Sequence, residues 1–198
     1  MEITASMVKE LREKTGAGIM DCKRALAETE GEFEKAVDYL RQKGLSAAAK
    51  KSGRATSEGI VGAYIHAGGK IGVLIEVNCE TDFVARTEAF QQLVKDLSMQ
   101  IAAANPLYLA REDIPQEVLS RERAIYEAQA REMRRPENVI PRIVEGKLEK
   151  YFSETCLIEQ SFVKDEEMTI AQLLAQHIAK LGENITIRRF VRYHVGVD

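Results

Sequence analysis

The side chains that could act as nucleophiles, general bases or metal ligands are scattered along this 198-residue chain. They are three histidines and three cysteines, namely His66, His177, His194, Cys22, Cys79 and Cys156. The histidines fall on different predicted elements, so they suggest no Ser-His-Asp or Cys-His arrangement. The cysteines form no Cys-x-x-Cys pair and no zinc pattern, and we interpret them as reduced, buried thiols of a cytosolic protein. We therefore expect no catalytic residue, no metal site and no cofactor.

Two other patterns could bind ions or phosphates, and neither has the required spacing. The acidic run Asp165-Glu166-Glu167 lacks the alternating ligands of a calcium loop, so we predict a solvated turn there. The pair Gly68-Gly69 is not followed by a Gly-Lys-Ser/Thr motif or directly by a helix. We interpret it as the tight turn of a β-hairpin, since glycine adopts the positive φ angles of such turns.

The segment of residues 76–86 reads Glu-Val-Asn-Cys-Glu-Thr-Asp-Phe-Val-Ala-Arg and is unusual for a connection. It follows a strand pattern and precedes a helix pattern, so Thr81, Asp82 and Phe83 should lie at the end of a sheet. Function concentrates on loops that a rigid scaffold presents, and an exposed Phe there could anchor a partner. The alternative is that Phe83 packs onto its own core while Thr81 or Asp82 caps the next helix.

The elements that must position these residues fall into three regions. Residues 1–44 predict three short helices, the third ending at Gly44, as a small N-terminal domain. Residues 45–58 are small, polar and basic, and we interpret them as a linker with the solvated cluster Lys50, Lys51 and Arg54. Residues 59–198 predict a core domain.

The core domain begins and ends with strands and has helices between them. The strands are predicted at residues 60–66, 70–79 and 185–194, from their alternating apolar residues. Helices are predicted at residues 87–104, 115–133 and 137–155, with Pro141 in a first turn, and at residues 170–181, closed by Gly182. The predicted fold class is α+β.

The composition of the chain argues against a nucleic-acid-binding protein and against a membrane protein. The chain is 45% hydrophobic and 30% charged, which is typical of a globular protein. Its net charge of −3 argues against general nucleic-acid binding, which favours a basic surface. No apolar run is long enough to predict a signal peptide or a membrane span.

Two stretches resemble the signatures of one protein family. Residues 81–84 read Thr-Asp-Phe-Val, and residues 11–26 read Leu-Arg-Glu-Lys-Thr-Gly-Ala-Gly-Ile-Met-Asp-Cys-Lys-Arg-Ala-Leu. Both resemble translation elongation factor Ts, the guanine-nucleotide exchange factor for elongation factor Tu, in that family's order and at about its spacing. The remaining chain resembles the family's short form, so the likeness covers essentially all 198 residues.

The resemblance implies a fold and a partner. It implies a ubiquitin-associated-like N-terminal bundle and a three-stranded antiparallel sheet packed with helices. It implies that Asp82 and Phe83 enter the G domain of elongation factor Tu and disturb its magnesium and phosphate environment, while Thr81 and Val84 hold the loop. A second set of contacts, from Arg12, Ile19 and Met20, is implied against another face of that domain. Such an exchange factor is not an enzyme in the covalent sense.

Some features depart from the family pattern or leave an alternative. Ile19 stands where the family often has Met, which weakens that contact, and Ser161 stands where it usually has Pro. The short form supplies one core subdomain where long forms supply two, so we expect a homodimer through the sheet, binding two elongation factor Tu molecules. The alternative function is a general adaptor, a ubiquitin-associated-like module joined to an unrelated core. A catalytic function has no constellation to support it.

Overall fold

The computed structural model describes residues 3–196, and the chain divides into two compact units. The first unit comprises the residues up to Tyr64, together with Leu74–Ser98 and Ala171–Val191. The second comprises Ile65–Val73, Met99–Ile170 and the residues from Arg192 on. Helices and a small antiparallel sheet make up the described chain, so the predicted α+β class is confirmed.

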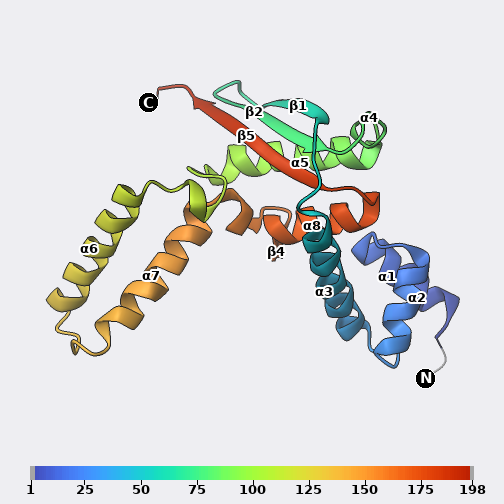
Figure 1. Ribbon diagram of the computed structural model, residues 1–198, viewed down its shortest axis with the longest axis horizontal. Coiled ribbons are helices and arrows are strands. Elements are labelled where there is room, and N and C mark those ends of the chain that lie inside the picture. The colour runs from blue at the N-terminus through green and yellow to red at the C-terminus, as the bar shows by residue number, and fades with distance from the viewer. Residues whose placement is uncertain (1–2, 197–198) are drawn as a thin grey trace. The chain divides into compact units, whose positions relative to one another are not determined.

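The N-terminal part of the first unit is a three-helix bundle, as predicted (Figure 1). Its helices are α1 (Ala5–Thr15), α2 (Ile19–Glu28) and α3 (Phe33–Lys51). Thr4 caps α1 by accepting a hydrogen bond from the Met7 amide, and Gly16 ends it in the left-handed conformation. The bundle has its own core, built from Val8, Leu11, Cys22, Ala25, Leu26, Ala36 and Val37. This closed core explains how three short helices form a stable arrangement.

The predicted end of the third helix at Gly44 is wrong, because α3 continues to Lys51. Gly44 is buried, and a Cβ there would lie 3.8 Å from the Ala175 carbonyl oxygen, so this glycine serves packing and does not stop the helix. The alanines that follow it favour helix strongly enough to offset one glycine. Lys51 donates a hydrogen bond to the Ile178 carbonyl at 3.3 Å, so it is bound to the fold and is not simply solvated.

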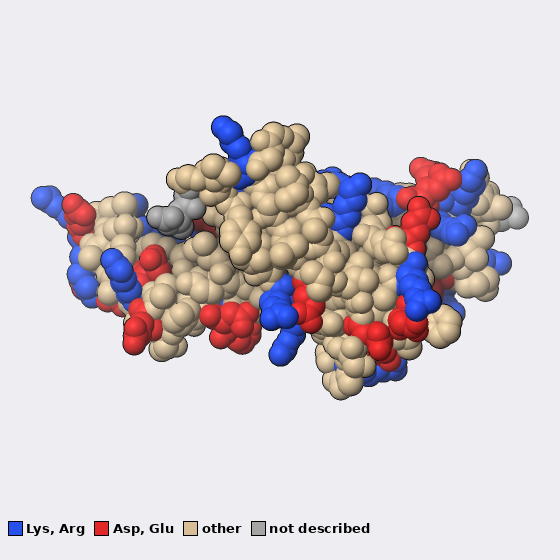
Figure 2. All heavy atoms as spheres, turned by 90° about the horizontal axis from the view of Figure 1, so that it is seen from above, with Lys and Arg blue, Asp and Glu red and all other residues tan. Residues whose placement is uncertain are grey.

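The sheet contains β1 (Glu58–Ile65), β2 (Ile71–Cys79) and β5 (Ile185–His194) in the order β1-β2-β5. The hairpin turn at Gly68 and Gly69 is confirmed, since both glycines have positive φ angles of 91° and 69°. One face is buried through Val73, Ile75, Val77 and Cys79, and α5 (Glu88–Ala104) runs along it (Figure 1). Charged side chains are sparse over the opposite face (Figure 2).

The second unit contains a helical hairpin of α6 (Gln116–Glu132) and α7 (Ile140–Thr155), which lie side by side in Figure 1. The predicted helix from residue 137 begins three residues later, and Pro141 lies in its first turn as expected. The helices share a core of Ile114, Ala130, Ile140, Val144, Leu148, Phe152 and Cys156. Short 3-10 turns, η1 (Arg111–Asp113) and η2 (Leu157–Glu159), flank the hairpin.

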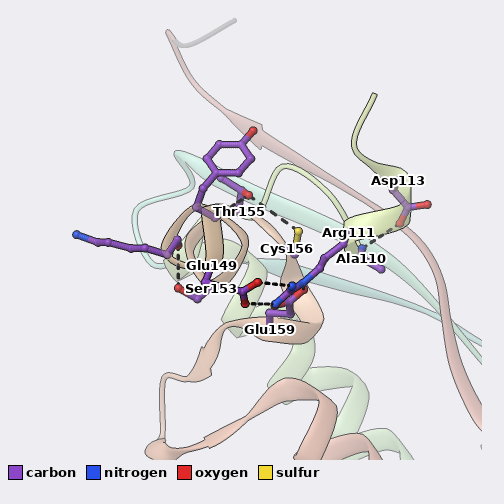
Figure 3. Close-up of polar contacts among 10 residues, drawn as sticks. Ala110, Arg111, Asp113, Glu149, Ser153, Thr155, Cys156 and Glu159 are labelled. Atoms are coloured by element: carbon purple, nitrogen blue, oxygen red, sulfur yellow. Dashed lines mark hydrogen bonds and ion pairs between the residues drawn. The ribbon is translucent and has the colours of Figure 1, made fainter. Parts of the chain in front are cut away.

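Arg111 joins the two 3-10 turns to α7 at the base of the hairpin (Figure 3). Its guanidinium donates to both oxygens of Glu149 and both oxygens of Glu159, and it stacks on the Phe152 ring at 4.4 Å from the centroid. These bonds raise the pKa of the Arg111 guanidinium and lower the pKa of the Glu149 carboxyl. Arg111 and Glu149 therefore stay charged at neutral pH, and their ion pair helps to fix the start of the hairpin.

The solvated turn predicted at Asp165-Glu166-Glu167 is instead part of a strand. β4 (Asp165–Thr169) pairs antiparallel with β3 (Ser161–Phe162) and leads into α8 (Ile170–Leu181). The buried amide of Gln100 donates to the Ser161 carbonyl at 3.1 Å and accepts from the Val163 amide at 2.9 Å. This contact with α5 fixes the β3–β4 connection. Within residues 3–196, no helix has the length and apolar character needed to cross a membrane.

Candidate functional site

The segment after β2 forms a four-residue helix, α4 (Asp82–Ala85), between two threonine caps. Thr81 has extended backbone angles, and its hydroxyl oxygen accepts a hydrogen bond from the Val84 amide at 3.4 Å. Thr87 donates to the Val84 carbonyl at 2.7 Å and accepts from the Phe90 amide at 3.2 Å, at the start of α5. Thr81 thus starts α4, and Thr87 bonds the end of α4 and the start of α5, so the chain makes a short, defined projection.

Phe83 points to solvent, with 81% of its surface exposed. The alternative that it packs on its own core is therefore wrong, although the helix cap that belonged to that alternative, at Thr81 or Asp82, is present at Thr81. Ala85, two residues later, is the residue of α4 that is buried. Asp82 is half-buried and forms an ion pair with Arg86 at 2.8 Å. Asp82 and the exposed Phe83 are thus adjacent on a short helix that packs on the protein through Ala85.

Hydrogen bonds to the start of α4 and the residue before it fix this segment to the turn before β5. They involve three residues that the sequence did not single out: Glu80, Glu183 and Asn184. Glu183 accepts hydrogen bonds from the backbone amides of Glu80 and Thr81, and Glu80 in turn accepts one from the Asn184 amide. Arg54 forms an ion pair with Glu80 at 3.4 Å, so it too is bound to the fold. The one signal in the sequence was the polar pair Glu183-Asn184 directly after a helix-ending glycine and before an apolar strand.

The thiol nearest the segment is a structural group. Cys79 is fully buried and donates to the Thr81 carbonyl at 3.1 Å. Burial, and next the charge of Glu183, raises the pKa of the Cys79 thiol, and burial likewise raises the pKa of Cys22 and Cys156. All three cysteines are buried and unpaired, as predicted. Protonated, enclosed thiols are poor nucleophiles.

His177 and the acidic residues give no sign of a reactive centre. His177 is half-buried, its Nδ1 lies 2.9 Å from the Leu173 carbonyl oxygen, and burial lowers its pKa. His177 is therefore a packing residue that bonds the backbone of its own helix, α8. Across the described residues, no group of three or more His, Cys, Asp or Glu side chains is arranged to hold a metal ion.

The second predicted group, Arg12, Ile19 and Met20, flanks the turn between α1 and α2. Arg12 is an exposed residue in the last turn of α1, and Ile19 and Met20 are the first two residues of α2. Ile19 is 57% exposed and Met20 is 65% exposed, although the rest of the apolar face of α2 is buried in the bundle core. The structure thus gathers Thr81, Asp82, Phe83 and Val84 around one short helix, and these three residues around one turn.

Comparison with known proteins identifies relatives along nearly the whole chain. The family model described as "Elongation factor TS" matches residues 44–197. Elongation factor Ts of Syntrophomonas wolfei is 63% identical over 194 residues, which cover 98% of this chain and 91% of the relative. The same-named proteins of Geobacter sulfurreducens and Thermoanaerobacter sp. (strain X514) are 60% and 62% identical, over 99% and 98% of this chain and 91% and 95% of the relatives.

Proposed function

The chain belongs to the elongation factor Ts family of translation elongation factors, and from this membership we propose that it promotes GDP release from elongation factor Tu so that GTP can bind. The step requires no covalent chemistry. The protein must bind nucleotide-free elongation factor Tu more tightly than the GDP-bound form. Linkage is reciprocal, so it then weakens GDP binding by the same factor.

The observation that supports this proposal most is that Phe83 is exposed on a short helix whose start is fixed by hydrogen bonds to Glu183. A large apolar side chain in water is costly for the free protein and gains free energy when a partner's pocket covers it. We propose that Phe83 and Asp82 insert beside the magnesium and phosphate site of elongation factor Tu. Thr81 and Val84 would hold them in the inserted position, since the Thr81 hydroxyl bonds the Val84 amide.

We further propose that Arg12, Ile19 and Met20 dock the N-terminal bundle on a second face of the same G domain. Ile19 and Met20 together present apolar surface that the bundle core leaves uncovered. Arg12 adds a cation at the edge of that surface, which is typical of protein interfaces. A second contact raises the effective concentration of the Phe83 segment at its site.

The outer face of the sheet supports a further part of the proposal, a homodimer. Val61 on β1, Leu74 on β2 and Val191 on β5 are all exposed, on the face away from the buried strand residues. Exposed apolar side chains on three paired strands form a surface that association would cover. Each protomer keeps its own Phe83 segment, so the dimer would bind two elongation factor Tu molecules.

Release of labelled GDP from elongation factor Tu tests the main proposal. The measurement compares spontaneous release with release in the presence of this protein, with excess unlabelled GDP to prevent rebinding. We expect release to accelerate by several orders of magnitude at saturating protein, since every 1.4 kcal/mol of differential binding gives about tenfold. Unchanged release would reject the exchange function. Equal binding to GDP-bound and nucleotide-free elongation factor Tu in a pulldown would favour the adaptor alternative.

A further inference from the structure

The carboxylate of Glu183 is the centre of the contacts that hold the Phe83 segment. It lies in the turn between α8 and β5, 102 residues after Thr81 along the chain. Its Oε2 accepts from the Glu80 amide at 3.1 Å and the Thr81 amide at 3.0 Å, and its Oε1 accepts from the Thr81 hydroxyl at 2.6 Å. One anionic side chain therefore receives three donors at the start of α4, and such charge-assisted bonds are stronger than neutral ones.

Glu183 is itself held in place by its neighbour in the same turn. The Asn184 amide donates to Glu80 Oε1 at 2.6 Å. The Glu183 carboxylate thus bonds the backbone at Glu80 and Thr81, and the Glu80 carboxylate bonds the backbone at Asn184. The Asn184 side chain, 2% exposed, donates to the carbonyls of Arg54 at 2.9 Å and Ser52 at 3.4 Å. The contacts that hold Glu183 and Asn184 therefore all lie within the first unit.

The Thr81 hydroxyl connects this anchor to the projecting helix. It donates a hydrogen bond to Glu183 and accepts one from the Val84 amide, so the carboxylate fixes the rotamer in which Thr81 caps α4. A four-residue helix is far too short to be stable by its own hydrogen bonds. Phe83 contributes little to holding it, because most of its surface is in water. The direction of Phe83 is thus set largely by the cap and by Glu183 behind it.

We propose that Glu183 is a positioning residue for nucleotide exchange: it holds Thr81 and α4 so that Asp82 and Phe83 meet elongation factor Tu already ordered. This inference rests on the proposed exchange function. A pre-organised contact segment avoids the entropy loss of ordering during binding, and that saving appears as faster exchange. Glu183 touches neither the nucleotide nor the partner in this scheme and acts through Thr81.

The test measures GDP release from elongation factor Tu with Glu183→Ala, Glu183→Gln, Phe83→Ala and the double variant Glu183→Ala/Phe83→Ala. We expect Glu183→Ala to slow release about tenfold or more, as expected for the loss of bonds to a charged group. Glu183→Gln keeps an oxygen for the two backbone amides and an amide group beside the Thr81 oxygen, so it should stay within about threefold of the parent. Glu117→Ala, an exposed acid in the first turn of α6, is the matched control and should be unchanged.

The double variant separates positioning from general stability. If Glu183 acts through the Phe83 segment, its removal should add little once Phe83 is absent, and the two effects should not multiply. Hydrogen exchange of the Glu80, Thr81 and Val84 amides should also rise in Glu183→Ala, with the amides of central β2 unaffected. Slow release with Phe83→Ala but normal release with Glu183→Ala would overturn the inference alone. Normal release with Phe83→Ala would instead reject the exchange role of the segment.

If Glu183→Ala does not fold, GDP release is measured with a milder variant, Thr81→Val. Thr81→Val removes the hydroxyl bond to Glu183 and the cap to Val84, and keeps both backbone bonds to the carboxylate. Slowed release with an unchanged unfolding midpoint would support positioning through Thr81. Release at the parental rate from Thr81→Val would overturn it.

Discussion

Phe83 combines a large aromatic surface with an almost fully exposed position, so its contributions to folding and to binding can be separated. We predict that Phe83→Ala lowers exchange efficiency roughly 30- to 1,000-fold, the effect of losing an interface contact of about 2–4 kcal/mol. The free energy of unfolding should change by less than about 1 kcal/mol, since the side chain has little to lose in the fold. Urea unfolding and GDP release on the same preparation check both parts.

The comparison for this prediction is Met133→Ala, which truncates another exposed apolar side chain, in the tip of the α6–α7 hairpin. It should leave both the unfolding free energy and the rate of GDP release unchanged.

Asp82→Ala should slow GDP release and keep the fold, because the ion pair of Asp82 with the exposed Arg86 contributes little stability. A Phe83→Ala protein that loses about 3–5 kcal/mol of stability and exchanges normally would contradict the role of this residue as a wedge.

His177 makes stability depend on pH. Burial lowers its pKa, with a smaller effect in the same direction from Lys180 and opposing effects from Asp96 and from its bond to the Leu173 carbonyl. The folded state therefore binds this proton less tightly than the unfolded chain, whose histidine titrates near the usual value of about 6.5. We predict that the free energy of unfolding falls as pH drops from about 7.5 to about 5.5.

Replacing the group that titrates should remove this pH dependence. His177→Gln keeps a polar side chain that cannot be protonated, so its urea midpoint should change less between those two pH values than that of the parent. Equal pH slopes for His177→Gln and the parent would show that other groups carry the effect.

At the scale of elements, the Arg111 cluster fixes the α6–α7 hairpin to the turns that flank it. Lysine keeps the charge at this position but cannot bond both Glu149 and Glu159 with a planar fork or stack as well on Phe152. We predict that Arg111→Lys lowers the free energy of unfolding by on the order of 1 kcal/mol, since the cluster is partly exposed. Arg123→Lys, at an exposed single pair with Glu145, should have a smaller effect in the same chemical denaturation experiment.

Local signals predicted the elements well where packing agreed with them. The alternation that starts at Ile185 predicted β5 with the bounds that the structure has, and Pro141 marked the first turn of α7. The sequence was misleading where a distant contact decides. Gly44 looked like a helix end, but the penalty for a helical glycine is about 1 kcal/mol and neighbouring alanines offset it. The strand at Asp165 depends on its pairing with β3, which Gln100 holds from 61 residues away.

The candidate site shows the same division between local and distant information. The motif around Thr81 predicted a cap, which is a local interaction, and the structure has it. Whether Phe83 turns inward or outward depends on how α4 leaves the sheet, and the sequence was compatible with both. The partner of that cap, Glu183, lies 102 residues away, and its place after a helix-ending glycine does not indicate that it bonds Thr81. Long-range hydrogen bonds to backbone amides leave no periodic pattern that a single sequence could reveal.

At the scale of the molecule, we propose the division into residues 1–44, 45–58 and 59–198 as N-terminal domain, connection and core, where the connection begins with the last turns of α3. The bundle core is complete within α1, α2 and the first half of α3. Deleting residues 1–44 should therefore leave a folded core, and it spares Ser52 and Arg54, whose carbonyls bond the buried Asn184. We predict about tenfold slower GDP release from the loss of one docking contact. The triple variant Arg12→Ala/Ile19→Ala/Met20→Ala in the full chain should match it, and an unimpaired truncated protein would exclude docking by the bundle.

The homodimer is the last prediction, and it depends on the outer face of the sheet. Val61 is 68% exposed at the centre of the edge strand β1, and Leu74 of the paired strand β2 is also exposed. A charge at Val61 would have to be desolvated in a sheet-to-sheet contact, whereas in the monomer it stays in water. Sedimentation velocity at micromolar concentration should therefore show a dimer for the parent and a monomer for Val61→Lys, with unfolding midpoints that agree. Val163→Lys, at an exposed valine outside this sheet, should remain dimeric. A parent that sediments as a monomer, and that binds elongation factor Tu one to one, would contradict the dimer while leaving the exchange mechanism of Phe83 intact.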